Sequence, residues 1–187
     1  MCAPALTTMT IELRPITVAD AEVHAAGEDV ESVKWLSGGY APIERVRDYL
    51  SGLEDNYRRQ RGKRGFGIWV NGRLGGYIDF DPDREDGLAP GDVNIAYSVH
   101  PWARRRGVAV EAVNLLCQWM ASWDIDTQAA IRVEPENVAS VKVAGRVGFK
   151  AVGELISSTD VQADGAPAHL LLFRRPLTQP NICLWRR

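Results

Sequence analysis

The segment between residues 99 and 109 constrains the fold of this chain most strongly. It reads VHPWARRRGVA, so an alternating apolar run ends near a proline, and a turn with three arginines and a glycine follows. An apolar-periodic stretch comes next, and this order predicts a strand, a loop and the start of a helix. Because the first turn of a helix has unpaired N–H groups and a partial positive charge, the loop is suited to binding an anion such as a phosphate.

The rest of the chain alternates between strand and helix patterns on both sides of this loop. Apolar runs and alternations predict strands at 11–14, 66–70, 73–80, 92–99, 129–133, 151–158 and 168–174. Helical spacing and capping signals predict helices after Thr17, after Pro42, after the loop and at 138–147. The order β-α-α-β-β-β-α-β-α-β-β indicates a mixed α/β fold with helices on the faces of one sheet.

Local signals add detail to this outline. Asn71-Gly72 predicts a tight hairpin turn, and Asp164-Gly165 predicts a second turn between the last two strands. Gly148 is expected to end the last helix. Trp119 and Trp123 fall on the apolar stripe of the long helix, so both are expected in the core.

Composition predicts a single folded domain and excludes several classes of function. With 187 residues, 45% of them hydrophobic, the chain is expected to form one domain over 10–176, after a leader at 1–9 and before a tail at 177–187. A net charge of −2 argues against general nucleic-acid binding. No apolar run is long enough for a membrane span and no signal peptide is evident, so a cytoplasmic protein is expected. The three cysteines and three histidines show no metal-ligand or disulfide pattern.

Two motifs carry a resemblance to a known family. Arg104, Gly107 and Ala109 match an Arg/Gln-x-x-Gly-x-Gly/Ala loop, which a tyrosine-containing strand enters and a long amphipathic helix leaves. An Asn137-x-x-Ser140 helix start and Gly148-Phe149 follow. With the order of elements, the chain resembles the GNAT superfamily of acyl-CoA-dependent N-acetyltransferases over roughly residues 10–176. The second motif resembles the RimJ/RimL-like branch, which contains ribosomal-protein N-terminal acetyltransferases.

The resemblance implies an enzyme that transfers an acetyl group from acetyl-CoA directly to an amine, without a metal. It also implies a largely antiparallel sheet in which strand 92–99 splays from strand 129–133 to admit the donor. The residues that it places at the donor are Tyr97, Ser98, Val99, Arg104, Arg105, Arg106, Gly107, Val108, Ala109, Asn137 and Ser140.

Individual roles follow from the same resemblance. The Val99 backbone would polarise the thioester carbonyl. Asn137 would bind the pantetheine amides, although asparagine is also a good N-cap. Ser140 would protonate the departing thiolate, although it could equally be an ordinary serine of a helix start.

The chain departs from the family at each familiar acid or base. Ala144 stands where many members have a tyrosine acid, and Asn94 and Arg132 stand where different branches have a base. Asp92 and Glu134 remain as candidate catalytic carboxylates. The lack of the family's usual acid and base residues favours an α-amine acceptor. An amine with a pKa of ~8 is about 10% neutral at pH 7, whereas a lysine is under about 0.1% neutral.

The acceptor itself stays open at this stage. A protein N-terminal α-amine is favoured, and the alternatives are a small amine, such as an antibiotic or polyamine, and a catalytically silent acyl-CoA-binding module. Asp79 is a candidate for acceptor binding, and Trp35 and Tyr40 could form an aromatic wall for it, although core packing would also explain the tryptophan. An exposed final strand could pair two subunits into a homodimer.

Overall fold

The computed structural model describes residues 9–36, 39–162 and 165–178. Its centre is a seven-stranded sheet in the order β1-β2-β3-β4-β5-β7-β6, in which only the β4–β5 pair is parallel. The strands are β1 (Ile11–Pro15), β2 (Arg64–Val70), β3 (Arg73–Asp81), β4 (Asp92–Val99), β5 (Gln128–Val133), β6 (Lys150–Val161) and β7 (Pro167–Pro176). The expected mixed and largely antiparallel sheet is therefore confirmed.

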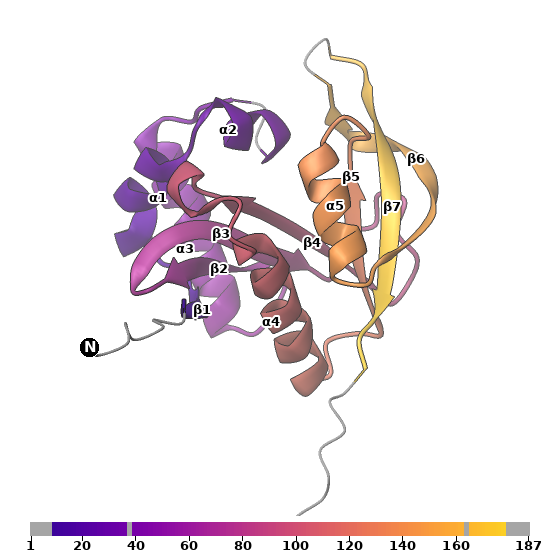
Figure 1. Ribbon diagram of the computed structural model, residues 1–187, viewed down its shortest axis with the longest axis horizontal. Helices are drawn as coiled ribbons and strands as arrows, with labels where there is room; N and C mark the ends of the chain where they lie inside the picture. Colours follow the sequence, from indigo (N-terminus) through magenta and orange to yellow (C-terminus); the bar gives the residue numbers. More distant parts are fainter. Residues whose placement is uncertain (1–8, 37–38, 163–164, 179–187) are drawn as a thin grey trace, which may run out of the picture.

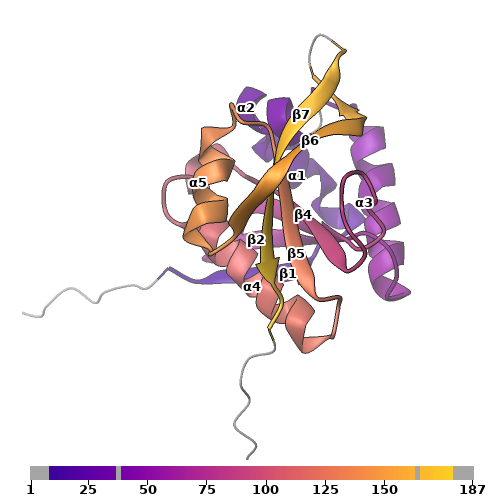
Figure 2. The ribbon, with the colours of Figure 1, turned by 90° about the vertical axis from the view of Figure 1, so that its right-hand side faces the viewer.

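Helices cover both faces of this sheet (Figures 1 and 2). They are α1 (Ala21–Gly27), α2 (Val30–Leu36), α3 (Ile43–Arg58), α4 (Val108–Ser122) and α5 (Val138–Arg146), with short 3-10 turns η1 (Val18–Asp20) and η2 (Pro101–Ala103). In Figure 2 the sheet lies between α3 on one side and α4 and α5 on the other. Ile78, Leu116 and Ile131 belong to the core under α4 and α5, and Leu50 and Tyr77 belong to a smaller core under α3.

Helix α4 follows the predicted apolar stripe except at its end. Trp119 packs against Phe66 and Phe80, with ring centroids 5.3 and 5.6 Å apart. Trp123, in contrast, is 60% exposed, so its expected place in the core is wrong. The helix ends at Ser122 and Trp123 is the C-cap, where the backbone leaves the helical path and carries the side chain off the buried stripe.

Two further expectations need correction, one about the first helix and one about the final strand. The single helix expected after Thr17 is in fact η1, α1 and α2, because the backbone is extended at Glu28 and a new helix begins after Asp29. The final strand β7 lies between β5 and β6, so it is not an exposed edge that could pair two subunits. Asp164 of the predicted second turn lies outside the described residues, but Gly165 does have a positive φ of 84°.

The parallel pair β4–β5 opens along its length. Register pairs join 92–94 of β4 to 128–130 of β5, and no pairing continues beyond them although both strands run on. Each strand meanwhile keeps its outer neighbour, with Val99 opposite Gly76 of β3 and Val133 opposite Leu171 of β7. The two halves of the sheet therefore diverge, which confirms the expected splay and leaves a gap between the carboxyl ends of β4 and β5.

Close packing of a histidine on a glycine fixes α1 to the end of β4. His100 is 1% exposed, and a Cβ added to Gly27 would lie 2.1 Å from its Cε1 atom. We expect Gly27→Ala to lower the free energy of unfolding by about 1–3 kcal/mol, the usual cost of overpacking, in urea denaturation. Gly145→Ala is the matched control, because Gly145 is also helical and a Cβ there meets nothing within 4 Å. Equal stability of the two variants would contradict the close approach.

Candidate active site

The loop between β4 and α4 presents backbone donors to solvent. Arg105, Arg106 and Gly107 are exposed, and α4 begins at Val108 with Gly107 as its N-cap. Arg105 and Gly107 both have left-handed backbones, with φ of 60° and 79°. No atom lies within 4 Å of the place where a Gly107 Cβ would stand. Open space, a helix N-terminus and two exposed cations therefore coincide at this loop, which suits it to binding a diphosphate.

The first arginine of the loop points inward instead. Arg104 donates from Nε to the Val99 carbonyl oxygen at 2.9 Å. Its other nitrogens donate to both carboxylate oxygens of Asp29, at 2.8 and 2.6 Å, and to the Ser32 hydroxyl at 2.8 Å. Among the described residues, Arg105 and Arg106 make no ion pair. These two arginines, not Arg104, are thus available to an anionic ligand in this structure.

At the end of β4 one backbone amide faces the gap. His100 N–H donates to the Gly75 carbonyl at 2.8 Å, so residue 100 hydrogen-bonds to β3. In an antiparallel pair the residues alternate, so Val99, opposite Gly76, directs its N–H and C=O away from β3. The carbonyl of Val99 is taken by Arg104, and its N–H points toward the gap. The same alternation directs the Ser98 backbone to β3, and its side chain is buried.

Two hydroxyl groups meet across the gap. The Tyr97 hydroxyl oxygen lies 2.8 Å from Ser140 Oγ, so β4 touches the first turn of α5. Burial raises the pKa of Tyr97 to about 12, and its hydroxyl therefore stays protonated at neutral pH. Ala144, where the family often has a tyrosine, is fully buried in the core and has no room for one. Only the individual residues, not this pairing, could be expected from the sequence.

Asn137 has a structural role at the start of α5. Its side-chain oxygen accepts a hydrogen bond from the Ser140 N–H at 3.1 Å, which confirms the N-cap interpretation. The expected contact with pantetheine remains a prediction. The cap fixes the first turn of α5, and with it the Ser140 hydroxyl beside Tyr97.

The three candidate carboxylates lie in very different surroundings. Asp92 accepts two hydrogen bonds from Arg174, at 2.6 and 2.9 Å, at the paired end of β4 and away from the opening. Asp79 is 1% exposed and accepts from the Tyr77 hydroxyl at 2.7 Å, and burial raises its pKa. Asp92 is therefore engaged in holding the sheet, and Asp79 is enclosed under α3.

Glu134 follows β5 directly and is partly exposed. Desolvation and the nearby charge of Glu136 raise its pKa. Its carboxylate makes no hydrogen bond or ion pair with any residue that the structure describes. Of the three candidates, it alone follows the diverging end of β5 and makes no hydrogen bond or ion pair among the described residues.

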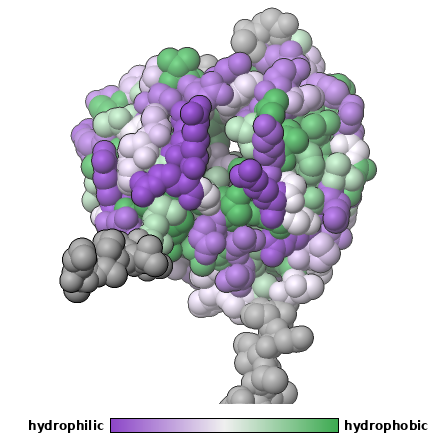
Figure 3. Space-filling view, in the orientation of Figure 1, coloured by the Kyte–Doolittle hydropathy of each residue, from purple (hydrophilic) through white to green (hydrophobic). Residues whose placement is uncertain are grey.

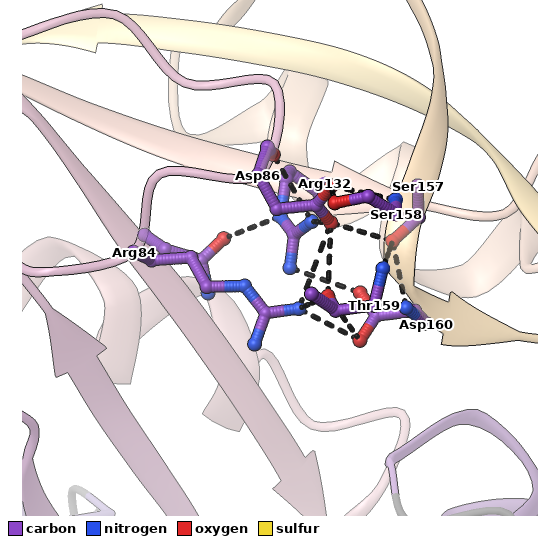
Figure 4. A network of polar contacts seen from close by, with 8 residues as sticks. Arg84, Asp86, Arg132, Ser157, Ser158, Thr159 and Asp160 are labelled. Atoms are coloured by element: carbon purple, nitrogen blue, oxygen red, sulfur yellow. Dashed lines mark hydrogen bonds and ion pairs between the residues drawn. The ribbon is translucent and has the colours of Figure 1, made fainter.

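A network of hydrogen bonds and ion pairs lies beside the opening and joins β5 to the β3–β4 loop and to β6 (Figure 4). Arg132, 6% exposed at its side chain, donates to Asn94 at 3.2 Å and forms ion pairs with Asp86 and Asp160 at 2.5 and 3.0 Å. Burial acts to raise the pKa of Asp86, but hydrogen bonds from Ser157 and neighbouring groups hold it well below its usual range. Asn94 and Arg132, which replace the bases of the family, therefore belong to a network that ties the β3–β4 loop to β6.

The aromatic residues expected at the acceptor lie on and after α2. Trp35 donates its Nε1–H to Glu31 at 2.8 Å, and the Lys34 ammonium lies 4.1 Å from its ring centroid. Tyr40 is 63% exposed. Figure 3 shows a hollow between α2 and α5 on this face of the molecule, with hydrophilic side chains on its borders. Trp35 is thus a surface residue of α2 and not part of either core cluster.

The described residues show no feature typical of a membrane span or of a metal centre. No helix among them is long and apolar enough to cross a membrane. No group of three or more histidine, cysteine, aspartate or glutamate side chains among them is placed to hold a metal ion.

Comparison with known proteins gives consistent matches. A family model described as an acetyltransferase (GNAT) domain matches residues 10–150. The uncharacterized N-acetyltransferase YjdG of Bacillus subtilis is 24% identical over 151 residues, which are 77% of this chain and 85% of YjdG. Among solved structures, RimL, the ribosomal L7/L12 α-N-protein acetyltransferase in complex with coenzyme A, has a TM-score of 0.75 at 18% identity, covering 92% of this chain and 96% of RimL. The aminoglycoside acetyltransferase AAC(6')-Ib with coenzyme A has a TM-score of 0.71 at 18% identity, covering 87% and 94%.

Proposed function

Because this chain belongs to the acetyltransferase (GNAT) family and is an acetyl-CoA-dependent N-acetyltransferase, we propose that its acceptor is a free α-amine, in the first place a protein N-terminus. The observation that carries the proposal is that the positions of the family's usual bases hold no base, which leaves only a glutamate beside the opening. Asn94 and Arg132 occupy the family's base positions and are engaged with each other. An amine that is already partly neutral needs little help to lose its proton, and an α-amine meets that condition.

The residues at the gap fit acetyl-CoA, which supplies a thioester that an amine can attack directly. Arg105, Arg106 and the N–H groups from Gly107 to Ala109 would hold the diphosphate, since they are exposed and carry positive charge. The diverging strands β4 and β5 would receive the thiol-bearing arm. Asn137, while capping α5, keeps its amide NH₂ for the arm.

Val99 and the paired hydroxyls would then act on the reacting group. The Val99 N–H would donate to the thioester oxygen as negative charge develops there, in the manner of an oxyanion hole. Ser140 would donate to the departing sulfur, and Tyr97 would donate to Ser140 and so keep that hydroxyl polarised. With its pKa raised by burial, Tyr97 stays a donor throughout the neutral range.

Glu134 would receive the proton of the acceptor amine, directly or through one water. Its raised pKa makes it a better proton acceptor than an ordinary surface glutamate, and its position after β5 brings it to the opening. The ammonium form of an acceptor would also be attracted by its negative charge. Asp79 and Asp92 are left with structural roles, because their partners hold them away from the opening.

A panel assay tests the acceptor class. Purified protein with acetyl-CoA is offered peptides with free N-termini, the same peptides with blocked N-termini and an internal lysine, and small amines that include aminoglycosides and polyamines. We expect free N-terminal peptides to be acetylated with the highest kcat/KM. Preference for a small amine, such as an aminoglycoside, would overturn the proposed acceptor class, and so would the absence of turnover with every free N-terminal peptide.

The pH dependence of this reaction gives a further prediction. For a peptide α-amine, kcat/KM should rise with pH as the Glu134 carboxyl group deprotonates, and rise again as the amine does. Glu134→Gln should remove the lower limb of the profile and reduce kcat at neutral pH about tenfold, less than the usual loss of a general base because about a tenth of the α-amine is already neutral.

Glu136→Gln is the control for the profile. The negative charge of Glu136 contributes to raising the pKa of Glu134. Its removal should move the lower limb to a more acidic pH while kcat at neutral pH stays nearly the same. A lower limb that persists in Glu134→Gln would assign the base to another group.

A further inference from the structure

We infer that Arg104 is a positioning residue that couples the acceptor-side helix α2 to the donor site, and not a ligand of the donor phosphates. One guanidinium makes four hydrogen bonds, all within the protein. It donates to the Val99 carbonyl, to both oxygens of Asp29 and to the Ser32 hydroxyl. The planar fork of arginine suits such a bidentate contact with a carboxylate, and no other side chain could make all four contacts.

Asp29 is as fully engaged as Arg104. Its Oδ1 atom accepts from the Ser32 N–H at 2.9 Å and from the Ser32 hydroxyl at 2.9 Å, as an N-cap of α2 does. The hydrogen bond with Arg104 holds the pKa of Asp29 well below its usual range, so the carboxylate stays charged. The two side chains are about one-third exposed, at 31% and 34%. To bind a phosphate through its side chain, Arg104 would have to leave an existing bidentate partner.

The hydrogen bonds of Arg104 join the expected acetyl-CoA site at Val99 to the expected acceptor side at α2. Val99 is the residue whose N–H faces the gap, and hydrogen bonding to its carbonyl fixes the orientation of the following peptide group. Helix α2 carries Trp35 and borders the hollow shown in Figure 3. The remaining contact, from Arg104 to Ser32, lies in the first turn of α2. Binding of acetyl-CoA at Val99 should therefore stabilise α2, and a displaced α2 should disturb the thioester site.

Three variants separate this role from phosphate binding. Asp29→Asn keeps a good N-cap for α2 but removes the charged partner of Arg104. Arg104→Lys keeps the positive charge but cannot hold Val99 and Asp29 together. Arg106→Ala removes an exposed cation of the same loop and leaves the link intact.

Calorimetric titration with acetyl-CoA and turnover at saturating acetyl-CoA are measured for each variant. We expect Asp29→Asn and Arg104→Lys to bind acetyl-CoA within about threefold of the unchanged protein and to lose about tenfold in kcat/KM for the acceptor, with the double variant no worse than either single one. Arg106→Ala should weaken acetyl-CoA binding about fivefold or more and leave the acceptor KM unchanged. If Arg104→Lys weakens acetyl-CoA binding as much as Arg106→Ala and leaves acceptor kinetics intact, Arg104 is a phosphate ligand and the inference is overturned.

Hydrogen exchange tests the link without an acceptor. The kcat/KM measurements on the three variants rest on the proposed function, since they need an amine that the protein acetylates, whereas hydrogen exchange does not. Acetyl-CoA should slow amide exchange in residues 33–36 of α2 in the unchanged protein, and the effect should disappear in Asp29→Asn. A merely structural ion pair would change the exchange of α2 equally with and without acetyl-CoA. No slowing in the unchanged protein would overturn the coupling, whether or not any acceptor is found.

Discussion

Gly107→Val should weaken acetyl-CoA binding about 100-fold. Gly107 has a φ of 79°, which a β-branched residue adopts only at a cost of about 1–3 kcal/mol. The valine would also occupy the open space above the first turn of α4, where the diphosphate approaches the backbone. Each charge-assisted hydrogen bond that the diphosphate then fails to make removes about 1.5–3 kcal/mol more. Isothermal titration calorimetry with acetyl-CoA measures the loss directly.

Gly72→Val separates backbone strain from loss of the site. Gly72 lies in the turn between β2 and β3, with a φ of 78° and nothing within 4 Å of an added Cβ. The φ angle is therefore almost the same as at Gly107, but no ligand is expected there. Gly72→Val should lower stability to a similar extent in urea denaturation and leave acetyl-CoA affinity unchanged. If both variants weakened acetyl-CoA binding equally, the loss in Gly107→Val would come from lower global stability and not from damage to the donor site.

Ser140→Ala and Tyr97→Phe should each slow the chemical step. Loss of a positioned proton donor costs about 10²-fold or more in rate, and we expect about that loss in kcat for Ser140→Ala. Tyr97→Phe removes only the partner of that donor, so we expect a smaller loss of about tenfold. Because the two hydroxyls form one unit, the double variant should be close to Ser140→Ala alone. Single-turnover kinetics with acetyl-CoA and the best acceptor of the panel measure the rate of the chemical step in the single and double variants.

Ser122→Ala and Tyr57→Phe provide matched controls. Ser122 donates to the Trp119 carbonyl at the end of α4, and Tyr57, in the last turn of α3, packs edge-on against Phe66 of β2. Neither hydroxyl lies at the gap, so both variants should keep the rate of the unchanged protein. Additive losses in the Ser140 and Tyr97 double variant would contradict the proposal that the two hydroxyls act as one unit.

Elements whose signals are local could be predicted from the sequence. The Asn71-Gly72 turn needs two left-handed residues in succession, and the structure has them at φ of 49° and 78°. Gly148, with a φ of 82°, ends α5 as expected, since the Phe149 N–H donates back to the Ala144 carbonyl. The loop before α4 also follows from its local motif, whereas the splay of β4 from β5 is implied only by the resemblance to the family.

Contacts between distant segments could not be predicted in this way. Arg104 and Asp29 are 75 residues apart, and nothing near the RRRG turn indicates that its first arginine faces inward. Tyr97 and Ser140 are 43 residues apart, so each could be singled out but not paired. The break between α1 and α2 did carry a signal, because Asp29 and Ser32 have the spacing of an N-cap and its partner.

A crystal structure with coenzyme A bound tests the site most directly. The diphosphate should lie on the N–H groups of Gly107 to Ala109 and beside the exposed Arg105 and Arg106, and the pantetheine arm should run between β4 and β5 with its sulfur near Ser140. Coenzyme A bound elsewhere, or a β4–β5 gap that stays closed by side chains, would contradict the assignment of this loop and gap as the donor site.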